Sequence, residues 1–179
     1  MSEPVASAAP SLQDDDFRLF GLAAGFVLDR TVLDERWKSL QRQAHPDRFA
    51  AQGAAAQRIA MQWSVRINEA YQRLKDPLKR AAYWCELNGA PIKAESNTAM
   101  PPAFLMQQME WREALDEAEG AEAIEALLDE TQAVRRQMLD QLGRTIDQQR
   151  DAAGAAQQVR ALMFVERFAE ELHTRLDRF

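Results

Sequence analysis

The tripeptide His45-Pro46-Asp47 brings together an imidazole and a carboxylate, the residue types from which metal and catalytic sites are built. The other histidine, His173, and the single cysteine, Cys85, are far away in sequence. Such spacing gives neither a metal-ligand cluster nor a Cys/His catalytic pair, so we expect no metal and no cofactor. Taken without context, His45 and Asp47 are typical of a turn histidine and a helix-capping aspartate.

An enzyme is not expected from this sequence. It has no Gly-rich phosphate loop, no metal constellation and no paired catalytic groups. A single cysteine cannot form an internal disulfide, which favours a reducing compartment and hence the cytoplasm. One cysteine is also too few for a thiolate-held iron–sulfur cluster, which usually needs about four. We expect no membrane partner, since no apolar stretch approaches the roughly 18 residues of a span.

Charge is distributed unevenly along the 179 residues. Residues 1–97 carry 13 basic and 12 acidic side chains, whereas residues 98–179 carry 9 and 16. Between Glu110 and Glu130 there are nine acidic residues and one basic residue, Arg112. Phosphate would be repelled from such a surface, so we expect no nucleic-acid partner.

The N-terminal half predicts a helical hairpin. Asp29 or Thr31 can cap a first helix that must end before Pro46, because proline disfavours helical geometry in the residue before it. A second helix is expected from about residue 54 to 74. The two helices carry apolar stripes at helical spacing, which we expect to pack against each other: Leu33, Trp37, Leu40 and Ala44 on the first, and Ile59, Trp63, Ile67, Ala70 and Leu74 on the second. Lys38 and Arg42 fall on the opposite, solvated face of the first helix.

The chain is expected to be all-α and to have two domains joined by a linker. Residues 1–13 predict a disordered tail, and residues 84–102 a helix end and a Pro/Ala-rich linker. Residues 103–179 contain no proline. We expect Gly120, Gly143 and Gly154 to divide them into an antiparallel three-helix bundle.

The first helix of this bundle has apolar residues on two sides. At about 100° per residue, its core stripe is predicted to contain Trp111 and Leu115. Leu105, Met106 and Met109 fall outside that stripe, among acidic residues. Flexible methionines rimmed by acid favour a protein-docking face. A third helix covering this side is the alternative, although burying the unpaired glutamates would be costly.

Residues 14–83 resemble the J domain of DnaJ-type co-chaperones. The resemblance rests on the His-Pro-Asp tripeptide between two amphipathic helices and on two downstream runs, Ile-Asn-Glu-Ala-Tyr at 67–71 and Asp-Pro-Leu-Lys-Arg-Ala-Ala-Tyr at 76–83. It implies an N-terminal J domain that contacts a DnaK-class chaperone and stimulates its ATPase. The chaperone-binding residues implied are His45, Pro46, Asp47, Lys38, Arg42 and Arg48, the last standing where a lysine is usual. For Lys38 and Arg42, an ordinary solvated face is the alternative.

Residues 103–117 and the run Val-Arg-Ala-Leu-Met-Phe at 159–164 are similar to the C-terminal domain of the HscB family, the J-proteins of iron–sulfur cluster assembly. This second resemblance implies a C-terminal three-helix domain that binds the IscU-type scaffold. The scaffold-binding residues implied are Leu105, Met106, Met109, Glu110, Glu113, Glu117 and Phe164. The helical projection singles out the first six from the sequence alone, and the family supplies Phe164.

Together the two resemblances imply a co-chaperone that delivers an IscU-type scaffold to an HscA-type chaperone. Methionine at position 109 replaces a leucine common in the family, a volume-conserving change. The cysteine-rich N-terminal module of the animal members is missing from residues 1–13. A J-protein with a different client, such as a general carrier of unfolded proteins, is the alternative function.

Overall fold

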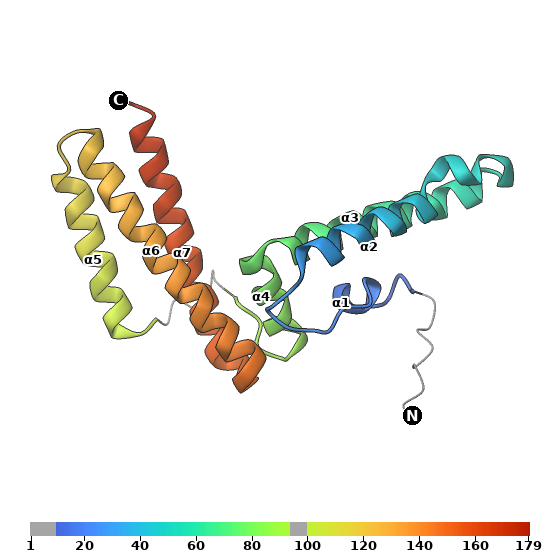
Figure 1. Cartoon of the computed structure of the whole chain (residues 1–179), viewed down its shortest axis with the longest axis horizontal. Coiled ribbons are helices and arrows are strands. Elements are labelled where there is room, and N and C mark those ends of the chain that lie inside the picture. The colour runs from blue at the N-terminus through green and yellow to red at the C-terminus, as the bar shows by residue number, and fades with distance from the viewer. Residues whose placement is uncertain (1–9, 94–99) are drawn as a thin grey trace. The chain divides into compact units, whose positions relative to one another are not determined.

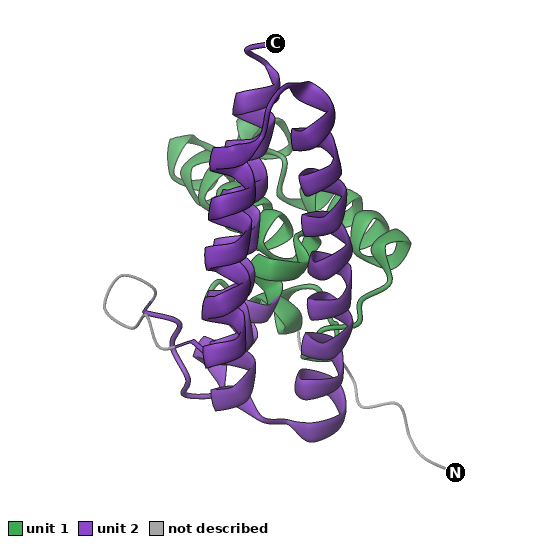
Figure 2. Ribbon diagram, turned by 90° about the vertical axis from the view of Figure 1, so that its left-hand side faces the viewer, with its two compact units in different colours: residues 1–80 green, residues 81–179 purple. Residues whose placement is uncertain are grey.

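The computed structural model describes residues 10–93 and 100–179, and all regular elements in these ranges are helices (Figure 1). The predicted all-α class is therefore confirmed. The chain forms two compact units, residues 1–80 and 81–179 (Figure 2). The domain limits expected from the sequence, 14–83 and 103–179, stay predictions. Residues 1–9 of the predicted tail and 94–99 of the predicted linker lie outside the described residues, while Ser11 to Asp14 form a hydrogen-bonded turn.

The first unit is built on an antiparallel hairpin of α2 (Arg30–Ala44) and α3 (Ala54–Lys75), seen in Figure 1. The carboxylate of Asp29 caps α2 by accepting the N–H groups of Thr31 and Val32 at 2.8 and 3.2 Å. The connection contains η1 (Pro46–Gln52), a 3₁₀ helix that begins within the His-Pro-Asp segment. The short helix α1 (Asp16–Leu19) packs on α3, and α4 (Pro77–Leu87) follows.

The apolar stripes of the hairpin are only partly buried. Leu33, Ile67 and Leu74 are buried, as the sequence predicts, and Phe17 of α1 is also buried. Towards the connection the prediction is wrong, because Ile59 is 55% exposed. The physical reason is the length of α1, because its four residues do not extend over the connection end of the hairpin, where no helix of the described residues covers Ile59.

A buried carboxylate fastens α1 to α3. Asp16 is fully buried, and its two oxygens lie 2.7 Å from a guanidinium nitrogen of Arg66 and 2.8 Å from one of Arg73. Arg66 also donates to the carbonyl oxygen of Asp14 at 2.7 Å. A buried carboxylate is costly unless it is paired, so these contacts fix where α1 lies along α3.

The second unit is a bundle of three helices, α5 (Pro102–Glu117), α6 (Ala121–Arg144) and α7 (Ala152–Leu176), which lie side by side in Figure 1. Its main core cluster is aromatic at the centre, where Trp111 of α5 stacks on Phe168 of α7 with ring centroids 5.5 Å apart. The fully enclosed aliphatic members come from all three helices: Leu115, Ile124, Val165 and Leu172.

Two of the three glycines expected to separate these helices do not do so. Gly120 precedes α6 with a positive φ of 91°, as predicted. Gly143 lies inside α6, which continues as the π-helical turn η2 (Thr145–Gln149), because burial of Leu142 and Ile146 outweighs the roughly 1 kcal/mol cost of a helical glycine. The reversal comes at Arg150, whose φ is 53°.

Gly154 has a different role, since it lies in the first turn of α7. Its N–H donates to Oδ1 of the capping residue Asp151 at 2.9 Å. A Cβ at this position would clash with the other carboxylate oxygen of Asp151. Because Gly154 has no side chain, the Asp151 carboxylate has room to cap the beginning of α7.

The anchoring role of Asp16 can be tested by comparing its substitution with that of the adjacent residue, Asp15. Asp16→Ala should lower the free energy of opening of α3 by roughly 2–3 kcal/mol, somewhat less than is typical of fully buried pairs, because Arg66 and Arg73 can still reach water. Asp15→Ala removes the cap of α1, in which the Asp15 carboxylate accepts the Arg18 N–H, together with an exposed ion pair to the Arg18 side chain, and it should cost about 1 kcal/mol.

Amide hydrogen exchange gives the measurement for each helix separately. Protection should fall in α3 and stay unchanged in α6 and α7. Equal effects of the two substitutions on α3 would contradict the role of Asp16 as the anchor.

Candidate functional site

The His-Pro-Asp segment projects from the connection end of the hairpin. His45 follows the last residue of α2, and Pro46 opens η1 at a position where a missing N–H costs nothing. The imidazole Nδ1 lies 3.4 Å from the Asp47 backbone nitrogen and 3.6 Å from Asp47 Oδ2. Both side chains are exposed, so the segment offers an imidazole and a carboxylate to a partner and encloses nothing.

Cations lie near this segment on the last two turns of α2. Lys38 and Arg42 are exposed, as predicted, and neither has an ion pair among the described residues. Arg48 folds back, and its guanidinium donates to the carbonyl oxygen of Arg42 at 3.1 Å. A cation at the carbonyl end of a helix is favourable, so Arg48 also ties η1 to the end of α2.

A polar seam between α2 and α3 fixes how this face is presented. Trp37 stacks on Tyr71 with centroids 4.8 Å apart, and its indole N–H donates to Asn68 Oδ1 at 2.9 Å. Gln41 donates to Asn68 Oδ1 at 2.7 Å and accepts from the Ser64 hydroxyl at 2.9 Å. These directional bonds set the register of the two helices, which apolar contacts alone would leave freer to slide.

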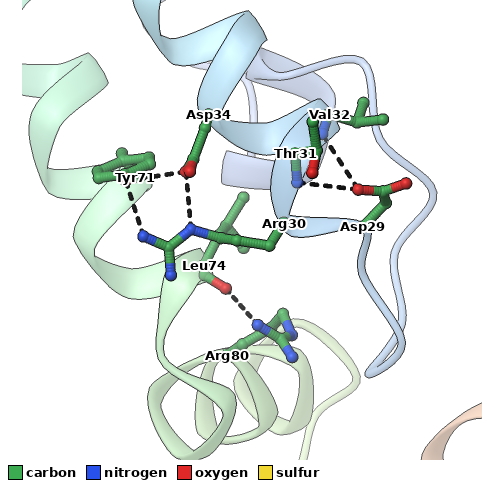
Figure 3. A network of polar contacts seen from close by, with 8 residues as sticks. All are labelled: Asp29, Arg30, Thr31, Val32, Asp34, Tyr71, Leu74 and Arg80. Atoms are coloured by element: carbon green, nitrogen blue, oxygen red, sulfur yellow. Dashed lines mark hydrogen bonds and ion pairs between the residues drawn. The ribbon is translucent and has the colours of Figure 1, made fainter.

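The seam continues at the far end of α2, where Arg30, Asp34 and Tyr71 form the triangle drawn in Figure 3. Arg30 donates to the Tyr71 hydroxyl at 3.0 Å and to Asp34 Oδ1 at 2.7 Å, and the hydroxyl donates to the same Asp34 oxygen at 2.9 Å. The hydrogen bond from Arg30 lowers the pKa of Asp34. The triangle therefore contributes stability at neutral pH, which is lost as acid protonates Asp34.

Helix α5 presents the second candidate site. Leu105, Met106 and Met109 are 45, 64 and 67% exposed, and Glu110, Glu113 and Glu117 are exposed on the same helix. The expected rotation of α5 is confirmed, because Trp111 and Leu115 are buried. No helix of the described bundle covers the three apolar side chains, which rules out the alternative of a buried second face.

The rotation of α5 is held from its inner side. Besides stacking on Phe168, Trp111 donates its indole N–H to Glu130 Oε1 on α6 at 2.9 Å. Arg112 lies over the Phe168 ring at 5.3 Å and bonds Glu171 of α7 at 2.6 Å. With contacts to both neighbouring helices, α5 cannot turn its Leu/Met side inward without breaking them.

Phe164 differs from the other predicted scaffold-binding residues. It comes from α7 and is half-buried, with its ring edge-on to Phe104 at 6.0 Å and stacked with Phe168 at 6.2 Å. Arg112 lies 5.9 Å from the centre of the same ring. The structure therefore groups six of the seven predicted residues on α5 and places Phe164 in the wall between α5 and α7.

Sequence reasoning placed Trp37 in the apolar stripe but missed its hydrogen bond and the polar residues that hold these faces in place. Trp37 and Gln41 on α2, like Ser64 and Asn68 on α3, are spaced by four, which puts each pair on one helix face. That spacing was a usable signal for the seam. Arg112 offered another, as the one cation in a strongly acidic stretch.

Metal ligands do not come together in the described residues, where no group of three His, Cys, Asp or Glu side chains could hold an ion. Cys85 is buried, and burial raises the pKa of its thiol to about 11, so it stays protonated at neutral pH. Within residues 10–93 and 100–179, no helix is both long and apolar enough to cross a membrane.

Comparison with known proteins covers both candidate sites. Residues 100–173 match a family model described as the HSCB C-terminal oligomerisation domain. The chain is 54% identical over 171 residues to the co-chaperone protein HscB homologs of Burkholderia mallei and Burkholderia pseudomallei, an alignment covering 94% of this chain and 97% of each relative. Both relatives are named as co-chaperones.

Solved structures agree with this result. The HscB chaperone of Vibrio cholerae is 36% identical, and the match has a TM-score of 0.77 and covers 92% of this chain and 99% of that one. Human co-chaperone HscB is 27% identical, with a TM-score of 0.85 and coverage of 93% and 84%. Identity above one half over nearly the whole length leaves no doubt of kinship: the chain belongs to the HscB family of co-chaperones.

Proposed function

We propose that this co-chaperone acts in iron–sulfur cluster biogenesis in the cytoplasm, as an adaptor and not as an enzyme. In this proposal residues 103–179 bind an IscU-type scaffold, and the J domain, residues 14–83, engages an HscA-type chaperone of the DnaK class and stimulates its ATPase. The observation that carries the proposal is the exposed Leu/Met face of α5 beside three glutamates, in a chain that also presents a His-Pro-Asp segment.

Support for the chaperone-binding role comes from the geometry of the hairpin end. His45, Asp47 and the cations Lys38 and Arg42 are exposed there, while the polar seam holds α2 rigidly against α3. A preformed face loses little conformational entropy on binding. ATP hydrolysis itself belongs to the partner.

Support for the scaffold-binding role comes from the chemistry of α5. Leu105, Met106 and Met109 offer adaptable apolar surface, and the neighbouring glutamates favour a partner with basic residues around an apolar patch. Pairing of two copies through this face is disfavoured, since acid would meet acid. Phe164 is half-buried, and in the proposal it forms the α7 side of the same docking surface.

Carrying both sites on one chain has a physical consequence. A scaffold held by one domain is presented to the chaperone at an effective concentration set by the connection, without any new contact between the partners. A substitution at one site should consequently impair the function of that site and leave the function of the other site intact.

His45→Gln tests the chaperone site. It should abolish stimulation of the ATPase of a purified HscA-type chaperone while leaving scaffold affinity, measured by calorimetry, within about twofold. His173→Gln, the same change at an exposed position of α7, should alter neither quantity. Loss of scaffold binding in His45→Gln would contradict the division into two sites.

Joint replacement of Leu105, Met106 and Met109 by Ala tests the apolar part of the scaffold site. Scaffold affinity should fall by roughly 30- to 100-fold, as expected for truncating a central apolar cluster. Leu87→Ala, at a side chain of matched 46% exposure in α4, should have no effect. A melted circular dichroism spectrum for the triple variant would assign these residues to the core. If the unsubstituted protein binds denatured model proteins in preference to the scaffold, that result favours the general-carrier alternative.

Joint replacement of Glu110, Glu113 and Glu117 by Gln tests the electrostatic part. The association rate should drop several-fold at low salt, and its dependence on ionic strength should flatten, because long-range attraction to a basic partner is removed. A variant with the same loss of charge on α6, at Glu122, Glu125 and Asp129, serves as the control. Equal effects of the two variants would mean that net charge matters and the α5 face does not.

A further inference from the structure

We propose that the exposed face of α5 is also a modification site, at which a hydroperoxide oxidises Met106 and Met109 to methionine sulfoxide and thereby weakens scaffold binding. This inference rests on the proposed function and adds a means of regulation to the same site. We call these two residues the methionine pair.

The methionine pair is open to solvent and belongs to one surface. Met106 and Met109 are three residues apart on α5, so their side chains are neighbours on adjacent turns of the helix. Both are more than half exposed, and Leu105 completes the apolar face beside them. Two thioether sulfurs are therefore within reach of a dissolved oxidant at the place where a partner would dock.

Most other described methionines are shielded. Met138 packs against the core cluster of the bundle, and Met163 is half-buried on α7. Met100 is half-buried as well, and its sulfur accepts a hydrogen bond from the Gln108 amide at 3.0 Å. Among the described residues only Met61 on α3 is exposed to a similar degree as the methionine pair.

The oxidation itself needs only a peroxide. A sulfur lone pair attacks one peroxide oxygen, so that an S–O bond forms while the O–O bond breaks. Sulfur loses two electrons, the peroxide gains them, and its second oxygen leaves with a proton as water or an alcohol.

The acidic surroundings of the methionine pair favour an uncharged oxidant. Glu110 follows Met106 by four residues, and Glu113 follows Met109 by four, so each methionine has an exposed carboxylate one turn further along α5. Anionic oxidants are repelled by this charge, whereas neutral hydrogen peroxide is not.

A sulfoxide on this face would oppose docking. Its oxygen is a strong hydrogen-bond acceptor, and the nearby donors of α5 are engaged. Arg112, the one cation of the helix, bonds Glu171 at 2.6 Å, and the Gln107 amide donates to Glu110 at 3.4 Å. The sulfoxide oxygen therefore takes its hydrogen bonds from water and loses them when an apolar patch of a partner covers it.

Oxidation of the methionine pair should leave the fold intact. Both side chains lie outside the core, and α5 is held from its inner side by Trp111 and Leu115. Cys85 is buried, and because its thiol stays protonated it is a poor target for peroxide. The change is also reversible, since a methionine sulfoxide reductase returns the thioether while two of its thiols become a disulfide and the oxygen leaves as water.

The test compares oxidised and untreated forms of the full-length protein. Each form is exposed to graded doses of hydrogen peroxide, freed of peroxide, and titrated calorimetrically against an untreated, purified IscU-type scaffold. Peptide mass spectrometry gives the sulfoxide fraction at each methionine. The double variant Met106→Leu/Met109→Leu removes both sulfurs at nearly constant volume, and Met61→Leu is the matched control, because Met61 is 58% exposed but lies on α3.

Oxidation should weaken scaffold binding of the unsubstituted protein and of Met61→Leu by about tenfold or more, each relative to its own untreated form. The loss should follow the sulfoxide fraction at positions 106 and 109, and treatment with methionine sulfoxide reductase should reverse it. The double leucine variant should change by less than about twofold on treatment, relative to its own untreated form. Far-UV circular dichroism should show the same helical content throughout.

Three results would overturn the proposal: full oxidation at both positions without loss of affinity, an equal loss in the double leucine variant, or a loss that accompanies melting of the helices. If untreated protein bound the scaffold in any of these cases, the proposed function would stand without the modification site. If the untreated, unsubstituted protein failed to bind the scaffold, both would fall.

Discussion

A tryptophan that stacks on one neighbour and donates its indole N–H to another fixes the rotation of a helix, and each unit of this protein depends on one. In the first unit Trp37 of α2 stacks on Tyr71 and donates to Asn68. In the second, Trp111 of α5 stacks on Phe168 and donates to Glu130. Stacking sets the distance between helices, and the hydrogen bond leaves one orientation of the ring.

Each of these tryptophans has a residue that must face solvent within two positions of it on its helix. Lys38 directly follows Trp37, and Met109 lies two positions before Trp111. Successive residues on a helix differ by about 100°, so fixing the indole inward turns these neighbours outward. The contacts that stabilise each fold therefore also decide which side chains a partner can touch.

Helix positions followed closely from the sequence, because their determinants are local. Asp29 caps α2, Pro46 limits its end, and the aromatic and aliphatic spacing of α5 predicts its rotation. The failures concern burial and capping contacts that residue spacing alone does not reveal. Burial of Ile146 carries α6 past Gly143, the carboxylate of Asp151 explains Gly154, and the short reach of α1 leaves Ile59 open. Of the candidate site, the exposed residues could be found from spacing, but the side chains that orient them could not be assigned until their partners across the helix interface were known.

The residues that hold α5 in place differ from the residues that a partner would contact. This difference explains how such a protein keeps an apolar face exposed to water. Leu105, Met106 and Met109 contribute nothing to the core, so their cost is the exposure of apolar surface, and the adjacent glutamates keep that surface soluble by charge repulsion between copies. If the exposed side chains themselves held α5 in place, any substitution that adapted the face to a partner would also change the fold. Because Trp111 and Glu130 hold α5 from behind, the outer side is free to vary with the partner, as long as the inner side does not.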